Sequence, residues 1–332
     1  MPLLDILWRD EHLVAVFKPA GWLVHRTGLD AGETRFVLQT LRDQLGLHVY
    51  PVHRLDKGTC GVLLFALTPG VARTLTEAFT GRSVAKRYLA FVRGWMPSPV
   101  DVDHALRPDD APADSPAQAA HTRFRRLARI ELEAVSDPRF PRTWACLVEA
   151  WPATGRRHQI RRHLKHLAHP IIGDSTHGKG PLNRWWAARL GLQRLWLHAL
   201  SVELAHPVSG QPLTIHSGFP EIRCPGRAEG LVVQRSSPAI GRMNEPTADS
   251  AVRNPDLAAW DRLLSVDGWR LEAPTEAGPA SEHPRKQVLT ADVRDPAPDA
   301  VPPAPGRPPD PGPAADHDRS PPGSTIQPAG RV

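Results

Sequence analysis

The sequence feature that most constrains the fold is a succession of strand-like segments with few helical segments between them. Apolar or alternating segments typical of strands lie at residues 4–8, 13–17, 22–25, 62–66, 86–94, 123–135 and 143–151. Helical spacing occurs at 32–45, where Val37, Leu41 and Leu45 are four residues apart, and again at 71–79. Strands that follow one another without crossover helices usually pair antiparallel. The sequence therefore predicts an α+β fold with a mainly antiparallel central sheet flanked by helices and loops.

The composition divides the chain into a main part and a different C-terminal part. Residues 271–332 contain 15 of the 36 prolines and few large apolar residues, which predicts a disordered tail. Residues 221–254 are polar and irregular and are expected to form an insertion, while 255–270 have the spacing of an amphipathic helix. We therefore expect one main domain over residues 1–220, onto which this terminal helix packs. Within it, residues 101–120 are rich in Asp, Ala and Pro and predict an irregular insertion.

Charge is unevenly distributed along the chain. The predicted tail has a net charge of −3, so the preceding 270 residues carry +9. A basic globular part is typical of proteins that bind nucleic acids, although many basic proteins have no such partner. The three cysteines, Cys60, Cys146 and Cys224, are far apart and indicate neither a disulfide framework nor a Cys zinc site. No apolar signal core is visible and no apolar run approaches the ~18 residues of a membrane span, so we expect a cytoplasmic protein with no membrane partner.

The segment His53–Gly61 places a carboxylate in a loop between basic residues, directly before an apolar run. Asp56 follows Arg54 by two residues and is followed by Thr59, so a tight loop can hold an ionised carboxylate beside a cation. Such a carboxylate suits a nucleophile or a general base. The same pattern is also compatible with a surface salt bridge or a turn-capping Asp.

A second segment, residues 156–166, is strongly basic and contains no acid. Arg157, Arg161 and Lys165 are spaced four residues apart, so on a helix they should share one stripe. A helix N-terminus after the Thr-Gly turn at 154–155 could also bind a phosphate. The pattern is typical of a solvated basic helix face, and it also suits a surface that contacts RNA phosphates.

Histidines in the same region raise the question of a zinc site. They are His158, His163, His166 and His169. Spacings of three and five residues on a helix can bring two ligands together. The intervening Arg and Lys residues would repel a dication, and neither Cys nor Asp lies among them, so we expect no metal. Phosphate-loop and dinucleotide-binding fingerprints are missing from the sequence, so we also expect no cofactor.

The segment around Asp56 resembles the HRLD-x-x-TSG-LLL-x-A signature of the pseudouridine synthases that include the large-subunit rRNA and tRNA enzymes of bacteria. In that family the Asp attacks the target uridine, so the resemblance implies that Asp56 is the nucleophile. Cys60 stands where the family usually has Ser, which keeps the size of the side chain but weakens its hydrogen bonding. The family's Arg before Leu-Asp moves into the space left by the flipped uridine, and this role falls on Arg54.

Further segments are similar to motifs of the same family. The basic segment is similar to T-G-R-x-H-Q-I/L-R, whose last Arg pairs with the catalytic Asp, and the matching residue is Arg161. Lys86-Arg87-Tyr88 is similar to K-R-Y-x-A, which implies that Tyr88 lies against the target base as a candidate proton acceptor. Lys18–Gly21 resembles the K-P-x-G motif, a turn that would support the site. The residues that we expect to bind substrate or RNA are His53, Arg54, Thr59, Ile160, Arg156, Arg157, Arg162 and Lys165.

The resemblance covers residues 4–218 and implies isomerisation of uridine to pseudouridine without a cofactor. The target base would leave its stack and enter a pocket, because its glycosidic bond is inaccessible within a stem. Within the family the likeness is greatest to enzymes that modify tRNA, which implies tRNA as the partner and uridine 65 at the edge of the T stem as the target. We also expect a monomer. The alternatives are an rRNA enzyme of the same family, a non-catalytic RNA-binding protein, and a carboxylate glycosidase, which would need a second catalytic acid.

Overall fold

The computed structural model describes residues 3–26, 32–109, 111–112, 114–219 and 254–272. All of them belong to one of two units of the chain, Met1–Thr275. The insertion predicted at 221–254 lies outside the described residues except for residue 254, and the predicted tail lies outside them except for residues 271 and 272. None of the helices in the described ranges has the length and apolar character needed to cross a membrane.

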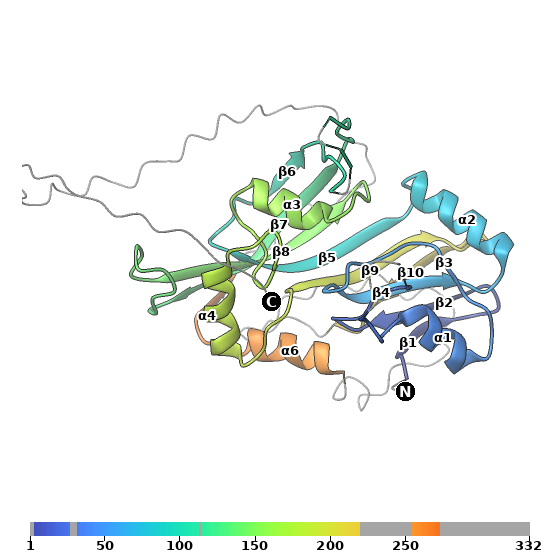
Figure 1. Cartoon of the computed structure of the whole chain (residues 1–332), viewed down its shortest axis with the longest axis horizontal. Coiled ribbons are helices and arrows are strands. Elements are labelled where there is room, and N and C mark those ends of the chain that lie inside the picture. Colours follow the sequence, from blue (N-terminus) through green and yellow to red (C-terminus); the bar gives the residue numbers. More distant parts are fainter. Residues whose placement is uncertain (1–2, 27–31, 110, 113, 220–253, 273–332) are drawn as a thin grey trace, which may run out of the picture. The chain divides into compact units, whose positions relative to one another are not determined.

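An 11-stranded sheet, counted over the described residues, organises the fold (Figure 1). Its main path runs in the order β1 (Ile6–Arg9), β2 (Leu13–Lys18), β4 (Cys60–Ala66), β9 (Leu197–Ala205), β5 (Ala85–Arg93), β8 (Thr143–Pro152), β7 (His121–Leu132) and β11 (Trp269–Leu271). Off this path, the additional pairs are β3 (Tyr50–Pro51) with β4, β10 (Pro212–His216) with β9, and β6 (Val100–Asp103) with β7. Within the described part of the chain, β4 and β9 form the only parallel pair. The predicted α+β fold with a mainly antiparallel sheet is confirmed.

Strands β2 and β4 are covered on both faces. Helix α1 (Val37–Leu45) packs on one face, where Val37 and Leu41 share a core with these strands. Helix α2 (Pro69–Thr80) packs on the other face through Leu75. Every residue of both strands is buried. Double coverage explains why these strands are continuous apolar runs in the sequence and do not alternate.

The other half of the sheet, built from β5, β8 and β7, packs against three later helices. They are α3 (Gln159–His166), α4 (Gly180–Leu190) and α6 (Pro255–Leu264) (Figure 1). Trp186 of α4 and Trp260 of α6 are fully buried in this core. The expectation that residues near 255 form a helix against the main domain therefore has a counterpart in α6, whose N-terminus is capped by the Asn254 side chain.

Several boundaries differ from the sequence prediction. Residues 22–25 form no strand and contribute only a bridge between Leu23 and Phe36, while the helix begins at Val37 because Phe36 has extended backbone. Residues 101–103 of the predicted irregular insertion belong to β6, which pairs with β7. The predicted terminal helix ends at Leu264, and residues 269–271 form β11. Between residues 170 and 220, α4, β9 and β10 had no predicted counterpart.

The parallel pair of β4 and β9 brings two backbones unusually close at the start of β4. Cys60 is aligned with His198, and Gly61 with Ala199. Gly61 has a φ of +111°, and a Cβ atom there would lie 2.2 Å from the carbonyl oxygen of Ala199. Only glycine fits this position without strain. The loop that carries Asp56 enters β4 at this point.

Candidate active site

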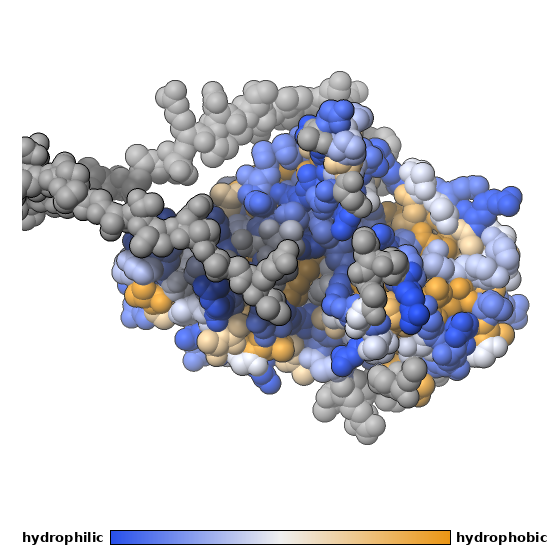
Figure 2. Space-filling view, in the orientation of Figure 1, coloured by the Kyte–Doolittle hydropathy of each residue, from blue (hydrophilic) through white to orange (hydrophobic). Residues whose placement is uncertain are grey.

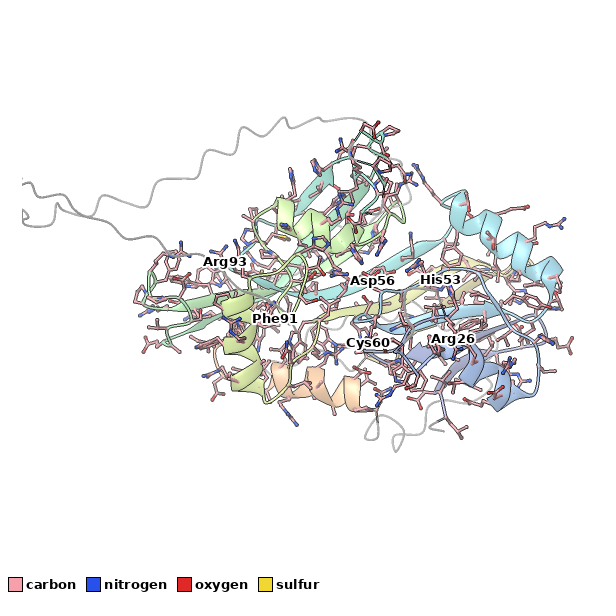
Figure 3. The ribbon with its side chains drawn as sticks, in the orientation of Figure 1. Arg26, His53, Asp56, Cys60, Phe91 and Arg93 are labelled. Carbon is pink, nitrogen blue, oxygen red and sulfur yellow. The ribbon has the colours of Figure 1, made fainter. Side chains whose placement is uncertain are left out.

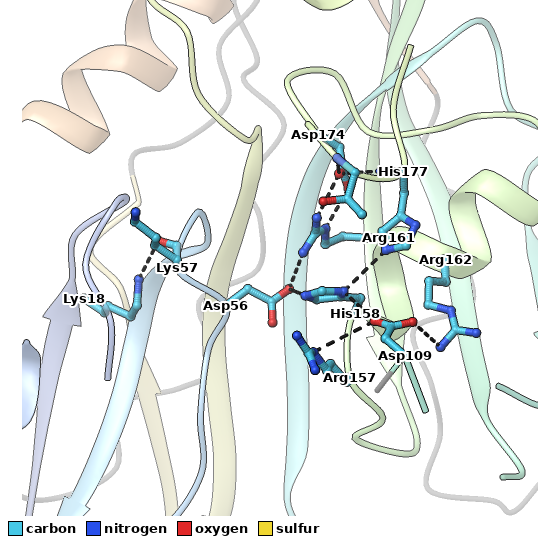
Figure 4. Close-up of polar contacts among 11 residues, drawn as sticks. Lys18, Asp56, Lys57, Asp109, Arg157, His158, Arg161, Arg162, Asp174 and His177 are labelled. Carbon is cyan, nitrogen blue, oxygen red and sulfur yellow. Dashed lines mark hydrogen bonds and ion pairs between the residues drawn. The ribbon is translucent and has the colours of Figure 1, made fainter. Parts of the chain in front are cut away.

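Lys18 holds the loop that carries Asp56 in place. Its buried ammonium donates hydrogen bonds to the carbonyl oxygens of Pro19, Lys57 and Thr59 at 3.0, 3.1 and 2.7 Å. Figure 4 shows the bond to Lys57. Burial lowers the pKa of Lys18 to about 7, because the charged form loses its hydration. The lysine of the K-P-x-G segment therefore fixes the backbone on the C-terminal side of Asp56. This gives the supporting role expected of that segment a structural basis.

Arg161 of α3 connects two carboxylates. Its Nη1 donates to Oδ2 of Asp56 at 3.1 Å, while Nε and Nη2 donate to the two carboxylate oxygens of Asp174 at 2.7 and 2.8 Å (Figure 4). The Arg161 side chain is 8% exposed and that of Asp174 is 0% exposed, so the pair with Asp174 is desolvated. The paired geometry matches the planar fork of a guanidinium. The structure thus joins Asp56 and Arg161 as the resemblance implied, and it adds Asp174.

Asp174 was missed by sequence reasoning. Its carboxylate also accepts hydrogen bonds from the backbone N–H groups of Thr176 and His177 at 2.9 and 2.8 Å. These bonds and the Arg161 guanidinium outweigh burial and hold the pKa of Asp174 below its usual value. The signal in the sequence is a Gly-Asp pair directly after the apolar residues Ile171 and Ile172, where a lone acid follows a buried segment.

His158 lies beside Asp56 and was not predicted as a site residue. Its Nε2 is 3.9 Å from Oδ2 of Asp56, and its Nδ1 is 2.9 Å from Oδ2 of Asp109. His177 Nε2 lies 3.4 Å from His158 Nδ1 (Figure 4). His158 has a φ of +54°, so the chain turns through it into α3, and its side chain does not cap the helix.

Asp109, His158 and His177 form the one group of side chains within the described ranges that could hold a metal ion, with ligand atoms within 4.8 Å of one another. Asp109 already pairs with Arg162 at 3.2 Å, and Arg157 lies 3.9 Å from it, so its charge is neutralised by the protein. The histidines of the zinc hypothesis do not converge. His163 contacts Thr122 and the His104 carbonyl, His166 stacks on His104, and His169 contacts the Arg93 carbonyl.

A pocket of about 520 Å³ opens at Asp56 between α2 and α3. Figure 3 shows Asp56 and His53 in the region between these two helices. Of the predicted site residues, those that line the pocket are His53, Arg54, Asp56, Thr59, Tyr88, Arg156, Arg157, Ile160 and Arg161. Figure 2 shows that the surface over α3 and the nearby end of β6 is mostly hydrophilic. A pocket of this size is in the usual range for small-molecule and base recognition.

The predicted basic stripe on α3 is wrong. Arg157 precedes the helix, which begins at Gln159, and Arg161 is buried. Lys165 is exposed but does not line the pocket. Arg162 is also outside the pocket lining, and it donates to the Arg107 carbonyl at 2.6 Å. The stripe was wrong because Arg161 is directed toward Asp56 and Asp174, which local spacing does not reveal.

Tyr88 lies in the pocket wall, on β5 next to a bulge between Arg87 and Tyr88. Burial raises the pKa of Tyr88 well above its usual value, and the nearby Asp56 carboxylate adds to the shift. The phenolate is therefore disfavoured, so the environment of Tyr88 does not suit the proton acceptor that the resemblance suggested. A neutral Tyr can instead pack against a base and donate a hydrogen bond.

His53 forms part of the pocket wall and is held there by two contacts. Its ring stacks on Phe79 with centroids 4.5 Å apart, and its Nε2 accepts a hydrogen bond from the backbone N–H of Leu64 at 3.0 Å. Burial, with Lys86 adding to the effect, lowers the pKa of His53 to about 3. The imidazole is therefore neutral near pH 7, so it can contact a ligand through its ring but not through a positive charge.

Cys60 begins β4 and is fully buried on the side of the site that faces α6 (Figure 3). Its Sγ lies 3.1 Å from His198 Nδ1 and accepts from Arg194 Nη2 at 3.0 Å. Arg194 also pairs with Asp256 of α6 at 2.7 Å. The sulfur at the family's Ser position thus retains polar partners, and the loop is connected to α6 through Arg194.

Comparisons with known proteins identify the family of this chain. Residues 12–166 match the family described as RNA pseudouridylate synthase. The chain is 47% identical over 227 residues to the tRNA pseudouridine synthase C of Vibrio cholerae, which covers 66% of this chain and 93% of that protein. It is 48% identical over 226 residues to the protein of that name from Salmonella typhimurium, with 66% and 86% covered.

The fold is also similar to a solved structure of human RNA Pseudouridylate Synthase Domain Containing 1. The TM-score is 0.51 at 25% sequence identity, and the match covers 64% of this chain and 82% of that one. The sheet and helices described above therefore have the fold of that solved structure. The chain therefore belongs to the RNA pseudouridylate synthase family, and it is an isomerase that converts uridine to pseudouridine.

Proposed function

We propose that the protein is a tRNA pseudouridine synthase whose target is uridine 65, with Asp56 as the nucleophile. The observation that carries the assignment of Asp56 is its contact with Arg161 at the pocket opening, beside the wall formed by Tyr88. A carboxylate paired with a guanidinium, yet 21% exposed toward a pocket, can reach a reacting atom. Support for tRNA comes from the two bacterial relatives, both called tRNA pseudouridine synthase C.

The chemistry follows from the charges around the pocket. The target uridine leaves its stack and enters the pocket, at the cost of lost stacking and pairing. Asp56 assists breakage of the bond between N1 and C1′, and Arg161 keeps its carboxylate oriented. The uracil then turns to present C5 to the sugar, the C5–C1′ bond forms in place of N1–C1′, and the Asp56 carboxylate is released. The proton lost from C5 is balanced by the proton that N1 gains, so the product is an isomer of the substrate. Tyr88 remains neutral and packs against the base. We expect the enzyme to work as a monomer and without a cofactor.

The deciding experiment maps pseudouridine in total RNA from a strain that lacks the protein, by carbodiimide labelling. We expect loss of the modification at tRNA position 65 and its return when the wild-type gene is supplied. Loss from a ribosomal site with position 65 unaffected would replace tRNA by rRNA as the substrate. Purified protein should also convert uridine 65 in an unmodified tRNA transcript.

A further inference from the structure

The pocket has a second basic wall in addition to the one formed by Arg156 and Arg157, and Lys86 of this wall contacts the carbonyl oxygen of Thr154 just before them. This wall comes from the C-terminal end of α2 and the beginning of β5. Its pocket-lining members are Thr76, Phe79, Thr80, Arg82 and Lys86. The K-R-Y-x-A resemblance led only to Tyr88, and nothing in the motifs pointed to Arg82. Asp56 and both groups of basic residues line the same pocket.

The positive charge of the α2 wall is not neutralised by the protein. Across the described ranges of the chain, neither Arg82 nor Lys86 has a carboxylate partner, and Lys86 donates one hydrogen bond, to the Thr154 carbonyl at 3.2 Å. Burial, with Arg82 adding to the effect, lowers the pKa of Lys86 to about 8. By contrast Arg87, one residue away, pairs with the buried Glu149. Arg82 is exposed, whereas Lys86 is partly buried. A partly desolvated cation such as Lys86 is costly without a counter-ion, and an anion bound beside it removes that cost.

The backbone of Arg82 gives an independent reason to look for a role of its side chain. Arg82 lies in the turn after α2 and has a φ of +63°. The left-handed conformation costs an arginine about 1 kcal/mol, whereas a glycine adopts it freely. The turn itself is closed by backbone hydrogen bonds from Gly81 to Glu77 and from Ser83 to Ala78, which do not require an arginine side chain. The left-handed conformation belongs to a common C-terminal cap of helices, where glycine is the usual residue, so an arginine is not expected here on backbone grounds.

We propose that Arg82 and Lys86 form a phosphate subsite for the RNA strand next to the target uridine. Arg156 and Arg157 would hold a neighbouring part of the strand, so that the flipped nucleotide lies over Asp56 beside these backbone contacts. Arg82 supplies a fork suited to phosphate oxygens, and Lys86 supplies a point charge. The hydroxyl groups of Thr76 and Thr80 line the same wall and can donate to the same phosphate. This inference rests on the proposed function, since it assumes that RNA occupies the pocket.

The test compares three variants of the full chain: Arg82→Gly, Arg82→Ala and Arg73→Ala. Arg73 lies on the same helix α2, is exposed and does not line the pocket, so its removal is the matched control for one lost positive charge. Glycine at position 82 relieves the left-handed backbone, so Arg82→Gly should keep or raise the melting temperature. Any loss of binding by that variant therefore cannot be attributed to unfolding.

The dissociation constant of an unmodified tRNA transcript is measured from about 50 to 200 mM salt, together with KM for pseudouridine formation. We expect both Arg82 variants to weaken RNA binding about tenfold at low salt and to raise KM by a similar factor. The slope of the logarithm of the binding constant against the logarithm of the salt concentration should become shallower by about the amount of one phosphate contact. Arg73→Ala should leave all three unchanged. The subsite proposal would be overturned if both Arg82 variants showed the salt dependence of the wild-type protein. It would also be overturned if Arg73→Ala weakened binding as much as the Arg82 variants do. If the wild-type protein forms no pseudouridine in tRNA, it is the proposed function that fails.

Discussion

Arg161 is fixed by Asp174 through two parallel hydrogen bonds, and this leaves its remaining nitrogen directed at Asp56. The Nε–Oδ2 and Nη2–Oδ1 distances are 2.7 and 2.8 Å, shorter than the 3.1 Å from Nη1 to Asp56. The buried ion pair with Asp174 therefore sets the position of the guanidinium. Asp56 and Arg161 both line the pocket, and the Asp56 side chain, 21% exposed against 8% for Arg161, is the more accessible of the two.

Asp174→Asn should lower turnover more than it lowers RNA binding. The amide can still accept the backbone N–H bonds, but it removes the second charged bond to Arg161 and frees the guanidinium to shift. A misplacement of about 1 Å at a reacting group can reduce the rate about 100-fold. We also expect a loss of about 3 kcal/mol of stability, because a buried ion pair is broken. Single-turnover rates, the dissociation constant and urea unfolding check these outcomes.

The control for Asp174 is Asp137→Asn, which breaks the exposed ion pair between Asp137 and Arg139. That change should leave rate and stability within experimental error, because exposed ion pairs contribute little. An Asp174→Asn protein with wild-type turnover would show that Asp174 does not position Arg161 for the reaction.

Asp56→Asn should abolish turnover while the protein still folds and binds RNA. The amide retains the shape of the side chain but lacks the nucleophilic charge, and removal of one obligatory group typically costs several orders of magnitude. Pseudouridine formation is followed with tritium-labelled tRNA. Activity above about one per cent of wild type would contradict the assignment of Asp56.

Gly61→Ala should destabilise the protein and disturb the site. The added Cβ atom would lie 2.2 Å from the Ala199 carbonyl, so β4 and β9 would have to separate next to the Asp56 loop. We expect the free energy of unfolding to fall by about 2 kcal/mol or more. Gly70→Ala in α2 is the matched control, because a Cβ atom added there would have nothing within 4 Å, and it should be neutral or slightly stabilising. Equal unfolding midpoints for the two variants would refute the role of the close approach.

Stability should fall as the pH drops below about 6.5. Burial lowers the pKa of His53 and His198 to about 3, and that of His163 to about 4. Each of these groups binds a proton near pH 6.5 when unfolded but not when folded, so acid favours the unfolded chain. Each such histidine lowers the free energy of unfolding by about 1.4 kcal/mol for every pH unit between about pH 6.5 and its pKa in the folded protein.

Urea unfolding at pH 7.5 and 5.5 measures this loss. His198→Gln removes one of the three groups and should make the difference between the two midpoints smaller, whatever its effect at pH 7.5. Identical midpoints at both values of pH would contradict the prediction.

Truncation after Pro274 should leave melting temperature and activity nearly unchanged. The Pro-rich composition of the segment that is removed cannot bury enough apolar surface to offset its ordering entropy. Truncation before α6, after residue 253, should instead unfold the protein, because Trp260 and Leu263 are fully buried. Comparable melting temperatures for the two truncated proteins would contradict this division of the chain.

The sequence alone predicted many of the features that short stretches of residues determine, although it missed the elements between residues 170 and 220. Strand-like runs without crossover helices predicted the antiparallel sheet, and the spacing of Val37 and Leu41 predicted the helix that covers it. The segments around Asp56, Tyr88 and Arg161 identified the family, because their residue types and spacings lie within short windows. Period and local motif are properties that a chain carries before it folds.

Only the tertiary structure decided which of these charges meet. Asp56 and Arg161 are 105 residues apart, and Arg161 and Asp174 join through a turn whose geometry depends on the surrounding core. Spacing alone placed Arg161 on an exposed stripe, whereas packing buries it against two carboxylates. Arg82 and Lys86 likewise reach the pocket because α2 ends and β5 begins beside it. Burial and pairing depend on which segments pack together, and no short stretch of sequence contains that information.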